Sequence, residues 1–230
     1  MRADFPLKDK YGFDDLVKVM RVLRGPGGCP WDAQQTHESI RKNFIEETYE
    51  AIEAIDAADP VLLQEELGDV LLQVIYHAAM EEEKGSFSID DVCDGICKKL
   101  VIRHPHIFGD VKVDTAEEVL SNWEMIKQQE KGQKTAAETL ESVPKVLPAL
   151  MRAEKIQKRA SRAGMDYDSV ADAFRDLRSE VDELEDAVKN GTPEQRGLEL
   201  GDLLFSAVNV SRFIGADAEE SLGLSCGKFV

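Results

Sequence analysis

Eight acidic residues form two sets whose spacing suits metal-dependent chemistry on phosphates. The second set follows the first by 133 positions, and the two sets are Glu47, Glu50, Glu66 and Asp69, then Glu180, Glu183, Glu199 and Asp202. Residues i and i+3 share a helix face, so each pair projects two carboxylates in one direction. Two such helices packed antiparallel gather four carboxylates, which repel one another unless a cation joins them. All-oxygen ligands favour hard cations such as Mg²⁺, which usually also binds substrate phosphates.

The two acidic sets are embedded in the same local sequence. Pro60 and Pro193 keep the offset of the acids, and so do the Leu-Gly-Asp triplets at 67–69 and 200–202. One Glu-x-x-Glu pair usually lies on a solvated helix face. A solvated face without a function is not expected to recur with the same proline and the same Leu-Gly-Asp triplet. Gly68 and Gly201 fall inside predicted helices, where glycine costs about 1 kcal/mol relative to alanine. We therefore expect another helix or a ligand to approach the backbone at both glycines.

Helix signals are dense and strand signals are nearly absent, which predicts an all-α fold. Capping residues, first-turn prolines and glycine stops divide the chain into helices expected at 14–24, 36–57, 60–83, 88–104, 115–129, 148–162, 169–189 and 193–215. The glycine- and proline-rich stretch 25–32 is expected to be a loop. The last segment, 219–230, is expected to be a poor helix because it contains two glycines.

Apolar residues alternate with the acids in the first pair of acidic helices. The side chains expected to be buried are Phe44, Ile45, Tyr49, Ile52 and Ile55 in one helix and Leu67, Val70, Leu71, Val74 and Ile75 in the other. This pattern is typical of a helical bundle whose ligand groups face inward.

A phosphate site also needs positive charge from the protein. Lys99 and Arg103 lie one turn apart near the end of the helix expected at 88–104. The helix dipole alone favours cations there, but their position after the acidic hairpin favours phosphate binding. Trp123 could stack on a base or fill the core, and its sequence context alone favours the core.

Charge and composition restrict the partners. The net charge is −17 over 230 residues, and such a surface repels nucleic acid and anionic membranes, so neither is expected as a partner. No stretch approaches the ~18 apolar residues of a membrane span, and the first residues lack the apolar core of a signal peptide. The four cysteines show no disulfide framework and are expected to be small buried residues with free thiols in the cytoplasm.

Several further segments form distinctive motifs. They are Gly28-Cys29-Pro30-Trp31-Asp32-x-x-Gln35-Thr36, Glu46-Glu47-Thr48-Tyr49-Glu50, Glu66-Leu67-Gly68-Asp69, Arg103-His104-Pro105-His106-Ile107-Phe108 and Leu147-Pro148-Ala149-Leu150-Met151-Arg152-Ala153. Together they resemble the MazG family of nucleoside triphosphate pyrophosphohydrolases, within the all-α NTP pyrophosphatase superfamily. The resemblance covers most of the chain, from about Leu16 to Lys228.

The resemblance implies an enzyme that hydrolyses NTPs or dNTPs to the monophosphate and pyrophosphate with Mg²⁺, Mn²⁺ being the alternative ion. It implies triphosphate contacts by Lys99 and Arg103, a position beside the nucleotide for Trp123, and metal ligation by Glu47, Glu50, Glu66 and Asp69. The catalytic candidates are Glu46, Glu47, Glu50 and Glu65, with Glu46 or Glu65 orienting water. We expect in-line attack of a metal-activated water at the α-phosphorus, since metal ions lower the pKa of bound water and offset developing charge.

The offset predicts two tandem MazG-like modules, residues 1–130 and 147–230, joined by a linker at 131–146. The second module is expected to be truncated, because the counterparts of Arg103 and Trp123 fall beyond Val230. Its metal ligands would be Glu180, Glu183, Glu199 and Asp202. We expect the first module to do the chemistry and the second to be weak, silent or structural. The incomplete bundle leaves an apolar face, which predicts a homodimer.

Two other functions remain open from the sequence. One is another enzyme of the superfamily, a dUTP/dCTP pyrophosphatase or a phosphoribosyl-ATP pyrophosphohydrolase, against which the Cys-Pro-Trp-Asp loop at 29–32 argues. The other is a non-catalytic acidic helical protein that binds a partner or senses nucleotides. The altered second copy favours this reading, and the intact first copy weighs against it.

Overall fold

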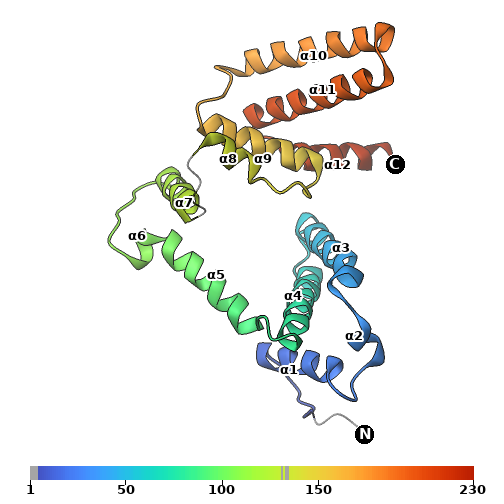
Figure 1. Ribbon diagram of the computed structural model, residues 1–230, viewed down its shortest axis with the longest axis vertical. Helices are drawn as coiled ribbons and strands as arrows, with labels where there is room; N and C mark the ends of the chain where they lie inside the picture. The colour runs from blue at the N-terminus through green and yellow to red at the C-terminus, as the bar shows by residue number, and fades with distance from the viewer. Residues whose placement is uncertain (1–4, 131, 133–134) are drawn as a thin grey trace. The chain divides into compact units, whose positions relative to one another are not determined.

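The chain is all-α in the part that the computed structural model describes, residues 5–130, 132 and 135–230. This confirms the predicted fold class. The chain divides into two compact units, Met1–Lys112 and Val113–Val230, which are considered separately (Figure 1). Among the described residues, none of the helices combines the length and the apolar character needed to cross a bilayer.

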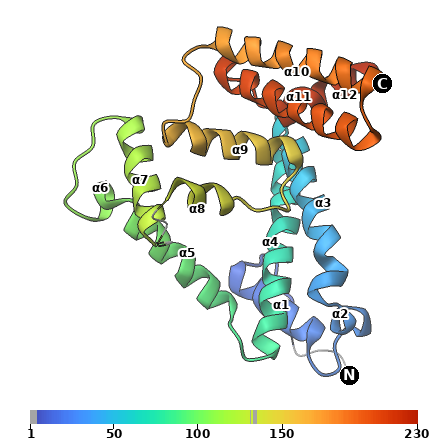
Figure 2. The ribbon, with the colours of Figure 1, turned by 45° about the horizontal axis from the view of Figure 1, so that its top comes forward.

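Unit 1 is built on a hairpin of two long helices, α3 (His37–Asp56) and α4 (Pro60–Glu83). Before it come α1 (Phe13–Arg24) and the short α2 (Pro30–Gln34), and after it come α5 (Ile89–Arg103) and the one-turn α6 (Pro105–Phe108) (Figure 2). The stretch expected to be a loop thus contains the start of α2, because proline suits the first position of a helix.

Local sequence signals determine where the hairpin helices begin. The Thr36 hydroxyl accepts a hydrogen bond from a first-turn N–H of α3. Asp59 Oδ1 accepts from the N–H groups of Val61 and Leu62, and Pro60 occupies the first position of α4. Each cap of this kind contributes about 1 kcal/mol. The turn between the helices, and with it the alignment of their acidic residues, is therefore encoded locally.

The large buried side chains of unit 1 collect at one end of the hairpin. They come from α1, α3, α4 and α5, and they include Met20, Ile40, Ile75, Met80 and Ile89. Burial of one such side chain contributes about 1.5–3 kcal/mol. Towards the α3–α4 turn the buried residues of α3 are instead Ala51 and Ala54. The hairpin is therefore anchored strongly at the α1 end and only through small side chains near its turn.

Most of the apolar residues that were expected to be buried in this hairpin are exposed. Ile75 is buried, but exposed fractions of 37–59% are found for Phe44, Ile45, Tyr49, Ile52, Ile55, Leu67 and Leu71. The prediction was wrong because α3 packs on α4 through only one of its faces, and no other helix of unit 1 covers the rest in the described residues. The hairpin therefore carries apolar side chains on faces that no other helix of unit 1 covers in the described residues.

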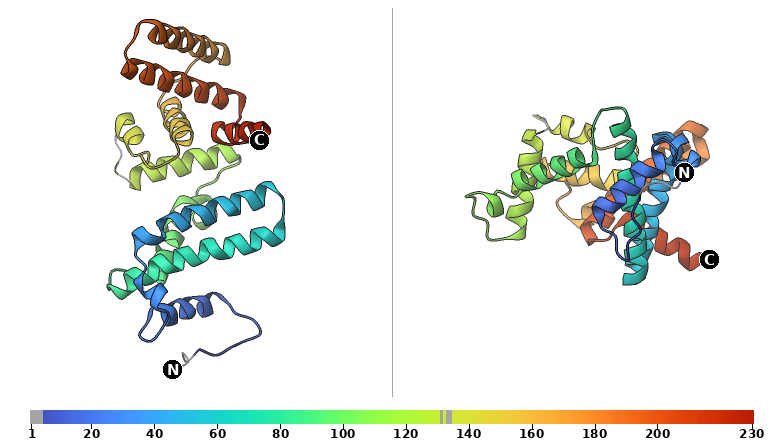
Figure 3. Two further views of the ribbon diagram at one scale, coloured as in Figure 1. Left: turned by 90° about the vertical axis from the view of Figure 1, so that its right-hand side faces the viewer. Right: turned by 90° about the horizontal axis from the view of Figure 1, so that it is seen from below.

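Unit 2 contains a second hairpin, α10 (Val170–Asn190) and α11 (Pro193–Ile214). Preceding it are α7 (Ala116–Glu130), α8 (Ala136–Glu141) and α9 (Ala149–Arg162), and α12 (Ala218–Phe229) follows it. Figure 3 shows each of the two hairpins as an antiparallel pair joined by a short turn. Both α9 and α12 pack near the hairpin, since α9 contacts α11 and α12.

Two segments of unit 2 are more ordered than their sequences suggested. The expected linker 131–146 contains α8, whose end is held by Arg159: its guanidinium donates to the carbonyl of Thr139 and to Ser142 Oγ. Positions 131, 133 and 134 of that linker lie outside the described residues. The expected poor helix at 219–230 is α12, because Asp217 caps its first turn. The cap and the packing of α12 on α9 and α11 together offset the low helix propensity of two glycines.

The boundary between the compact units lies at Lys112/Val113 rather than near residue 130. α7 therefore groups with unit 2, where Glu124 forms an ion pair with Arg162 of α9 at 3.2 Å. The limits of the two modules inferred from the repeat stay a prediction, since compactness does not test them. All four cysteines are free, as expected, but Cys93, Cys97 and Cys226 are exposed rather than buried.

Two histidines join α3 to α4 at the anchored end of the hairpin. The Nδ1 atoms of His37 and His77 are 2.6 Å apart, and His37 Nε2 lies 2.7 Å from Glu81 Oε1. The short separation between the Nδ1 atoms leaves room for one proton. Burial, and then the charge of His37, lower the pKa of His77. Lys84, and then His37, lower the pKa of Glu81 to about 2.

This histidine pair predicts that stability decreases in mild acid. In the unfolded chain His77 binds a proton near its ordinary pKa of 6.5, whereas folded His77 resists that proton, so the free energy of unfolding falls as the pH drops through 6.5 and below. The variant His77→Asn should lose less stability than the parent between about pH 7.5 and about pH 5.5. Urea unfolding at both pH values measures this, and equal losses in the two proteins would contradict it.

Candidate functional site: two acidic clusters

The hairpin of unit 1 brings carboxylates from both of its helices together. Oxygen atoms of Glu47 on α3 and of Glu66 and Asp69 on α4 all lie within 4.8 Å of one another. All three residues are partly buried. The i, i+3 spacing on α4 and the antiparallel pairing produce this convergence. An all-oxygen group of this kind could hold a hard divalent cation.

The electrostatics of this cluster indicate crowded negative charge. Burial, and then repulsion from Asp69, Glu50 and Glu66, raise the pKa of Glu47. Burial, and then repulsion from Glu50, Asp69 and Glu65, raise the pKa of Glu66. Since both shifts disfavour the charged form, a bound cation would relieve them. The site therefore has the charge and the ligand type that a metal ion needs.

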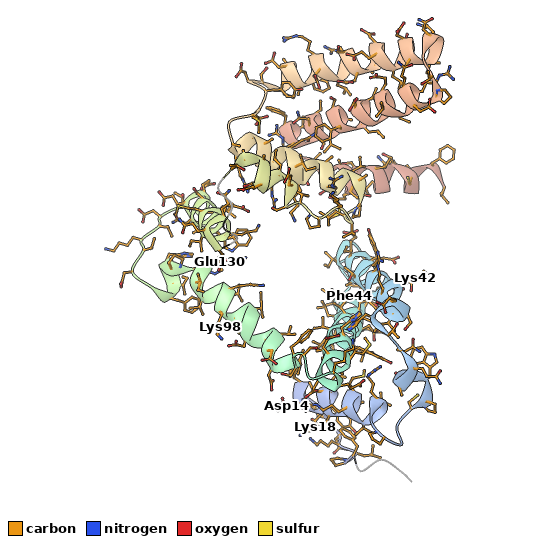
Figure 4. The ribbon with its side chains drawn as sticks, in the orientation of Figure 1. Asp14, Lys18, Lys42, Phe44, Lys98 and Glu130 are labelled. Atoms are coloured by element: carbon orange, nitrogen blue, oxygen red, sulfur yellow. The ribbon has the colours of Figure 1, made fainter. Side chains whose placement is uncertain are left out.

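The other predicted acids of the first set lie around this cluster. Glu50 is exposed, and hydrogen bonds between Glu50 and both Glu47 and Glu66 contribute to their raised pKa values. Glu65 is also exposed. Glu46 forms an ion pair with Lys42 at 2.8 Å on the outer surface of α3. Figure 4 labels Lys42 together with Phe44, which is two positions along and so on the opposite side of the helix.

Unit 2 has a matching cluster. Oxygen atoms of Glu180, Glu199 and Asp202 lie within 4.8 Å of one another, with Asp202 exposed. Burial, and then repulsion from Glu183, Asp176, Asp202 and Glu199, raise the pKa of Glu180. Glu183 stands beside the cluster, accepting a hydrogen bond from Ser179 at 3.0 Å, and both line a surface pocket of about 420 Å³. Each hairpin therefore positions three of its four predicted metal ligands in one group.

The predicted phosphate-binding residues do not lie beside the first cluster. Lys99 and Arg103 belong to the second half of α5, which departs from the C-terminal end of α4, whereas Glu66 and Asp69 lie in the first half of α4 (Figures 1 and 2). Trp123 is part of α7 in unit 2, where Lys127 Nζ lies 4.5 Å from the centre of its ring. The α3–α4 hairpin alone therefore brings the acidic residues together, and it does not bring Lys99 and Arg103 to them.

Two residues near the acids escaped the sequence analysis. In unit 2, Asp176 precedes Glu180 by one turn and accepts a hydrogen bond from Ser206 Oγ at 2.5 Å. In unit 1, Gln73 follows Asp69 by one turn, is 7% exposed, and has a side-chain oxygen without a hydrogen-bond partner. The i, i+4 spacing from a predicted ligand was the available signal for both.

The two helical glycines differ from expectation. A Cβ placed on Gly68 or on Gly201 would meet nothing within 4 Å. No other helix among the described residues approaches either glycine, so that part of the prediction was wrong. Approach by a ligand remains a proposal.

The open space at these glycines predicts that alanine stabilises both hairpins. Gly68→Ala and Gly201→Ala should each raise the free energy of unfolding by roughly 0.5–1 kcal/mol, because alanine restricts the unfolded chain and favours the helix. Urea unfolding measures the change. A loss of stability in Gly68→Ala with a gain in Gly201→Ala would mean that unit 1 has a close neighbour at Gly68 in solution.

Comparison with known proteins supports the resemblance. The profile of the MazG nucleotide pyrophosphohydrolase domain matches residues 35–108, which include the whole first cluster. The chain is 45% identical to the nucleoside triphosphate pyrophosphohydrolase/pyrophosphatase MazG of Thermotoga maritima over 218 residues, 95% of this chain and 82% of that protein. It is 42% identical to the nucleoside triphosphate pyrophosphohydrolase of Escherichia coli over 219 residues, 94% of this chain and 83% of that protein.

These matches extend through both units, whereas the domain profile covers only part of unit 1. They agree with the all-α architecture and with the acidic hairpins described above. The chain therefore belongs to the MazG family.

Proposed function

We propose that this chain is a nucleoside triphosphate pyrophosphohydrolase that converts NTPs or dNTPs to the monophosphate and pyrophosphate. The observation that carries the proposal is the convergence of Glu47, Glu66 and Asp69, whose oxygens lie within 4.8 Å of one another on two helices. The names of the relatives from Thermotoga maritima and Escherichia coli, both nucleoside triphosphate pyrophosphohydrolases, support the substrate class.

The residues of the first cluster fit a magnesium ion, with manganese as the alternative. The donors are all carboxylate oxygens, and the raised pKa values of Glu47 and Glu66 reflect burial and then mutual repulsion, which a cation would offset. Glu50, which contributes to the raised pKa of both residues, would complete a set of four ligands. When bound, the ion would offset the charge that develops on the phosphate oxygens and lower the pKa of a coordinated water.

The chain's own residues would position the substrate and the attacking water. We infer that Glu46 or Glu65, both next to the ligands in sequence, orients water in line with the α-phosphorus, so that pyrophosphate leaves. Engaging water in this way requires Glu46 to exchange its ion pair with Lys42. The family resemblance implies triphosphate contacts by Lys99 and Arg103 and a nucleoside contact by Trp123, and these roles are part of the proposal. Positioning and electrostatics of this kind can supply most of the rate enhancement in phosphoryl transfer.

Unit 1 would do the chemistry, and unit 2 would be weak, silent or structural. Ser179 and Leu198 stand in unit 2 where unit 1 has Glu46 and Glu65, so unit 2 has no acid to orient water at either position. Metal binding by Glu180, Glu183, Glu199 and Asp202 remains part of the proposal, supported by the second cluster. The two clusters would then bind the same ion but differ in reactivity.

We further propose that the protein is a homodimer in which α3 is covered by a second copy. Ile45, Tyr49 and Ile52 follow one another at helical spacing and are 49%, 53% and 44% exposed. They lie on the side of α3 away from Ala51 and Ala54, the residues that pack on α4. An exposed apolar stripe of this length is typical of a helix that packs against another helix. A second copy offers the same stripe and would make a symmetric interface.

A nucleotide panel with product identification tests the enzymatic proposal. The purified chain is incubated with the common NTPs and dNTPs, with dUTP and with phosphoribosyl-ATP, each with Mg²⁺ or Mn²⁺ and each with EDTA. We expect monophosphate and pyrophosphate from several NTPs and no product with EDTA. Release of orthophosphate, or activity on phosphoribosyl-ATP alone, would overturn the assignment. No pyrophosphate from any compound would favour the non-catalytic, nucleotide-sensing alternative.

A further inference from the structure

The histidine pair that joins α3 to α4, His37 and His77, forms part of the wall of a pocket in unit 1. The pocket has a volume of about 480 Å³, and its other walls include Phe44, Val74, Phe87 and Val92. The His37 side chain is 33% exposed, so ions in solution can reach the pair. Histidine is the commonest metal ligand in proteins. The pair is therefore a candidate site of a different kind from the all-oxygen acidic clusters.

The partners of His37 determine where its hydrogen lies. Its Nε2 is 2.7 Å from Glu81 Oε1, and Lys84 Nζ lies 2.7 Å from the same oxygen. Lys84, and then His37, lower the pKa of Glu81 to about 2, so at neutral pH this carboxylate accepts hydrogen bonds and donates none. Nε2 of His37 is therefore the donor. In the neutral ring, Nδ1 then keeps its lone pair.

His77 faces that lone pair from α4. Its Nδ1 lies 2.6 Å from Nδ1 of His37, and a single hydrogen is shared between the two atoms. The ring planes are within 2° of each other and the ring centres are 4.9 Å apart, so the two Nδ1 atoms point at one another. Burial, and then the charge of His37, lower the pKa of His77, which keeps this ring neutral at neutral pH. Since a neutral imidazole can carry its hydrogen on either nitrogen, the shared hydrogen can move to Nε2 of His77. Both Nδ1 atoms then offer lone pairs to the same point.

The carboxylate behind His37 has the position of an outer partner in a metal centre. A histidine that binds a metal almost always donates its other N–H to a carboxylate, a carbonyl or water, which fixes the ring and makes the ligating nitrogen more basic. Here Nδ1 of His37 faces His77 while Nε2 is held by Glu81. The hydrogen bond between the rings suffices to join the two helices. Glu81 adds the feature that is typical of metal ligation.

We propose that His37 and His77 bind a Zn²⁺ ion through their Nδ1 atoms, with Glu81 as the positioning residue that orients His37. Imidazole suits Zn²⁺, Cu²⁺ and Ni²⁺, whereas carboxylate oxygens suit Mg²⁺, so this site and the acidic clusters select different ions. With Zn–N distances of about 2.0–2.1 Å, two nitrogens on a tetrahedral Zn²⁺ lie roughly 3.3 Å apart. The rings must therefore turn and separate by less than about 1 Å. Water in the adjoining pocket would supply the remaining ligands.

The charges around the pair act in opposite directions. Arg41 lines the same pocket and opposes a divalent cation, whereas the Glu81 carboxylate and the net charge of −17 favour one. Arg41→Gln should therefore tighten the binding of Zn²⁺. Because the ion links α3 to α4 at the anchored end of the hairpin, it would stabilise unit 1. This role goes beyond the proposed hydrolysis and does not depend on it.

Nitrogen NMR of the histidine side chains tests the proposal on the full chain. The chain has four histidines, so a sample labelled at histidine gives few signals, and single substitutions assign them. Zn²⁺ is titrated in the presence of excess Mg²⁺, which competes for the carboxylate clusters. We expect the Nδ1 signals of His37 and His77 to shift in a saturable manner that is complete near equimolar Zn²⁺. The hydrogen on Nε2 of His37 should remain, because it is bonded to Glu81.

Three variants establish where Zn²⁺ binds. His77→Asn removes a ligand and Glu81→Gln removes the outer partner, and each should weaken the binding of Zn²⁺ by roughly 10–100-fold. The double variant His104→Gln, His106→Gln removes the other two histidines, whose ring centres are 5.6 Å apart, and it should bind Zn²⁺ as the parent does. Cooperative thermal unfolding without Zn²⁺ verifies that each variant is folded.

The outcomes separate this proposal from the enzymatic one. Zn²⁺ should raise the melting temperature of the parent and of the double variant, and should raise that of His77→Asn much less. If Zn²⁺ shifts neither Nδ1 signal, or if His77→Asn or Glu81→Gln binds as tightly as the parent, the proposal is overturned. Pyrophosphate release is measured with Mg²⁺ and without Zn²⁺, so either proposal can fail while the other holds.

Discussion

Replacing Glu47 with glutamine is expected to lower the rate of pyrophosphate release by roughly 100-fold or more. Glu47 contributes the α3 oxygen to the group formed with Glu66 and Asp69. A metal ion supplies several kcal/mol of charge stabilisation to phosphoryl chemistry, and each 1.4 kcal/mol corresponds to a factor of ten. A glutamine has nearly the same size and one neutral oxygen, so the change removes charge while keeping the shape of the site.

Glu180→Gln is the matched control, since Glu180 occupies the same place in the second cluster. We expect it to leave pyrophosphate release nearly unchanged. Continuous pyrophosphate detection with saturating Mg²⁺ and substrate measures both variants. If Glu180→Gln removes activity and Glu47→Gln does not, the roles of the two units are reversed. If neither variant changes the rate, the acidic clusters are not the catalytic centre.

Glu47→Gln, which should lower activity, should instead raise the stability of the fold when divalent cations are absent. The raised pKa of Glu47 means that its charged form is disfavoured in the folded chain, mainly by burial and by repulsion from Asp69. Glutamine removes that penalty, so Glu47→Gln should melt at a higher temperature than the parent in EDTA. Mg²⁺ should raise the melting temperature of the parent more than that of the variant. Calorimetry with and without Mg²⁺ therefore separates loss of a metal ligand from a folding defect.

Replacing Ile52 with lysine is expected to convert the proposed dimer into a monomer. The side chain is 44% exposed in the single chain and belongs to the stripe that also contains Ile45 and Tyr49. In the dimer it would be covered, and an unpaired ammonium there costs several kcal/mol. Such a cost weakens association by a factor of roughly 100 or more. Light scattering after size-exclusion chromatography at micromolar concentration reports the mass.

Val146→Lys is the control for this experiment. Val146 is 82% exposed and lies in unit 2, far along the chain from the stripe. We expect this variant to retain the mass of the parent. A parent protein that is already monomeric at micromolar concentration would contradict the proposed interface, as would a dimer that survives Ile52→Lys.

Local signals made much of the fold predictable. Asp59-Pro60 and Thr192-Pro193 start the second helix of each hairpin where expected, because capping and a first-turn proline act within a few residues. The convergence of Glu47, Glu66 and Asp69 followed from helix periodicity and an antiparallel turn. Helix starts and the spacing of side chains on a helix depend on neighbours in the sequence, so these predictions are confirmed.

The sequence does not predict in the same way which helix faces are covered by neighbouring helices. Tyr49 and Ile52 have the apolar character of core residues, yet they are exposed because only one partner helix is available. Lys99 and Arg103 follow the acids in the chain, but α5 departs from the far end of α4. The histidine pair gave no signal in the sequence, since it results from the packing of α3 on α4.

The uneven anchoring of the first hairpin has a consequence for its motion. The large side chains Met20, Ile75 and Met80 hold one end, whereas Ala51 and Ala54 hold the region near the turn. Amides around the turn should therefore exchange with deuterium through local opening, while those around Ile75 exchange only when the whole unit unfolds. A cation that links the two helices at Glu47, Glu66 and Asp69 should slow exchange at the turn by opposing local opening. Because it binds only the folded unit, it should also slow the exchange around Ile75 that requires global unfolding.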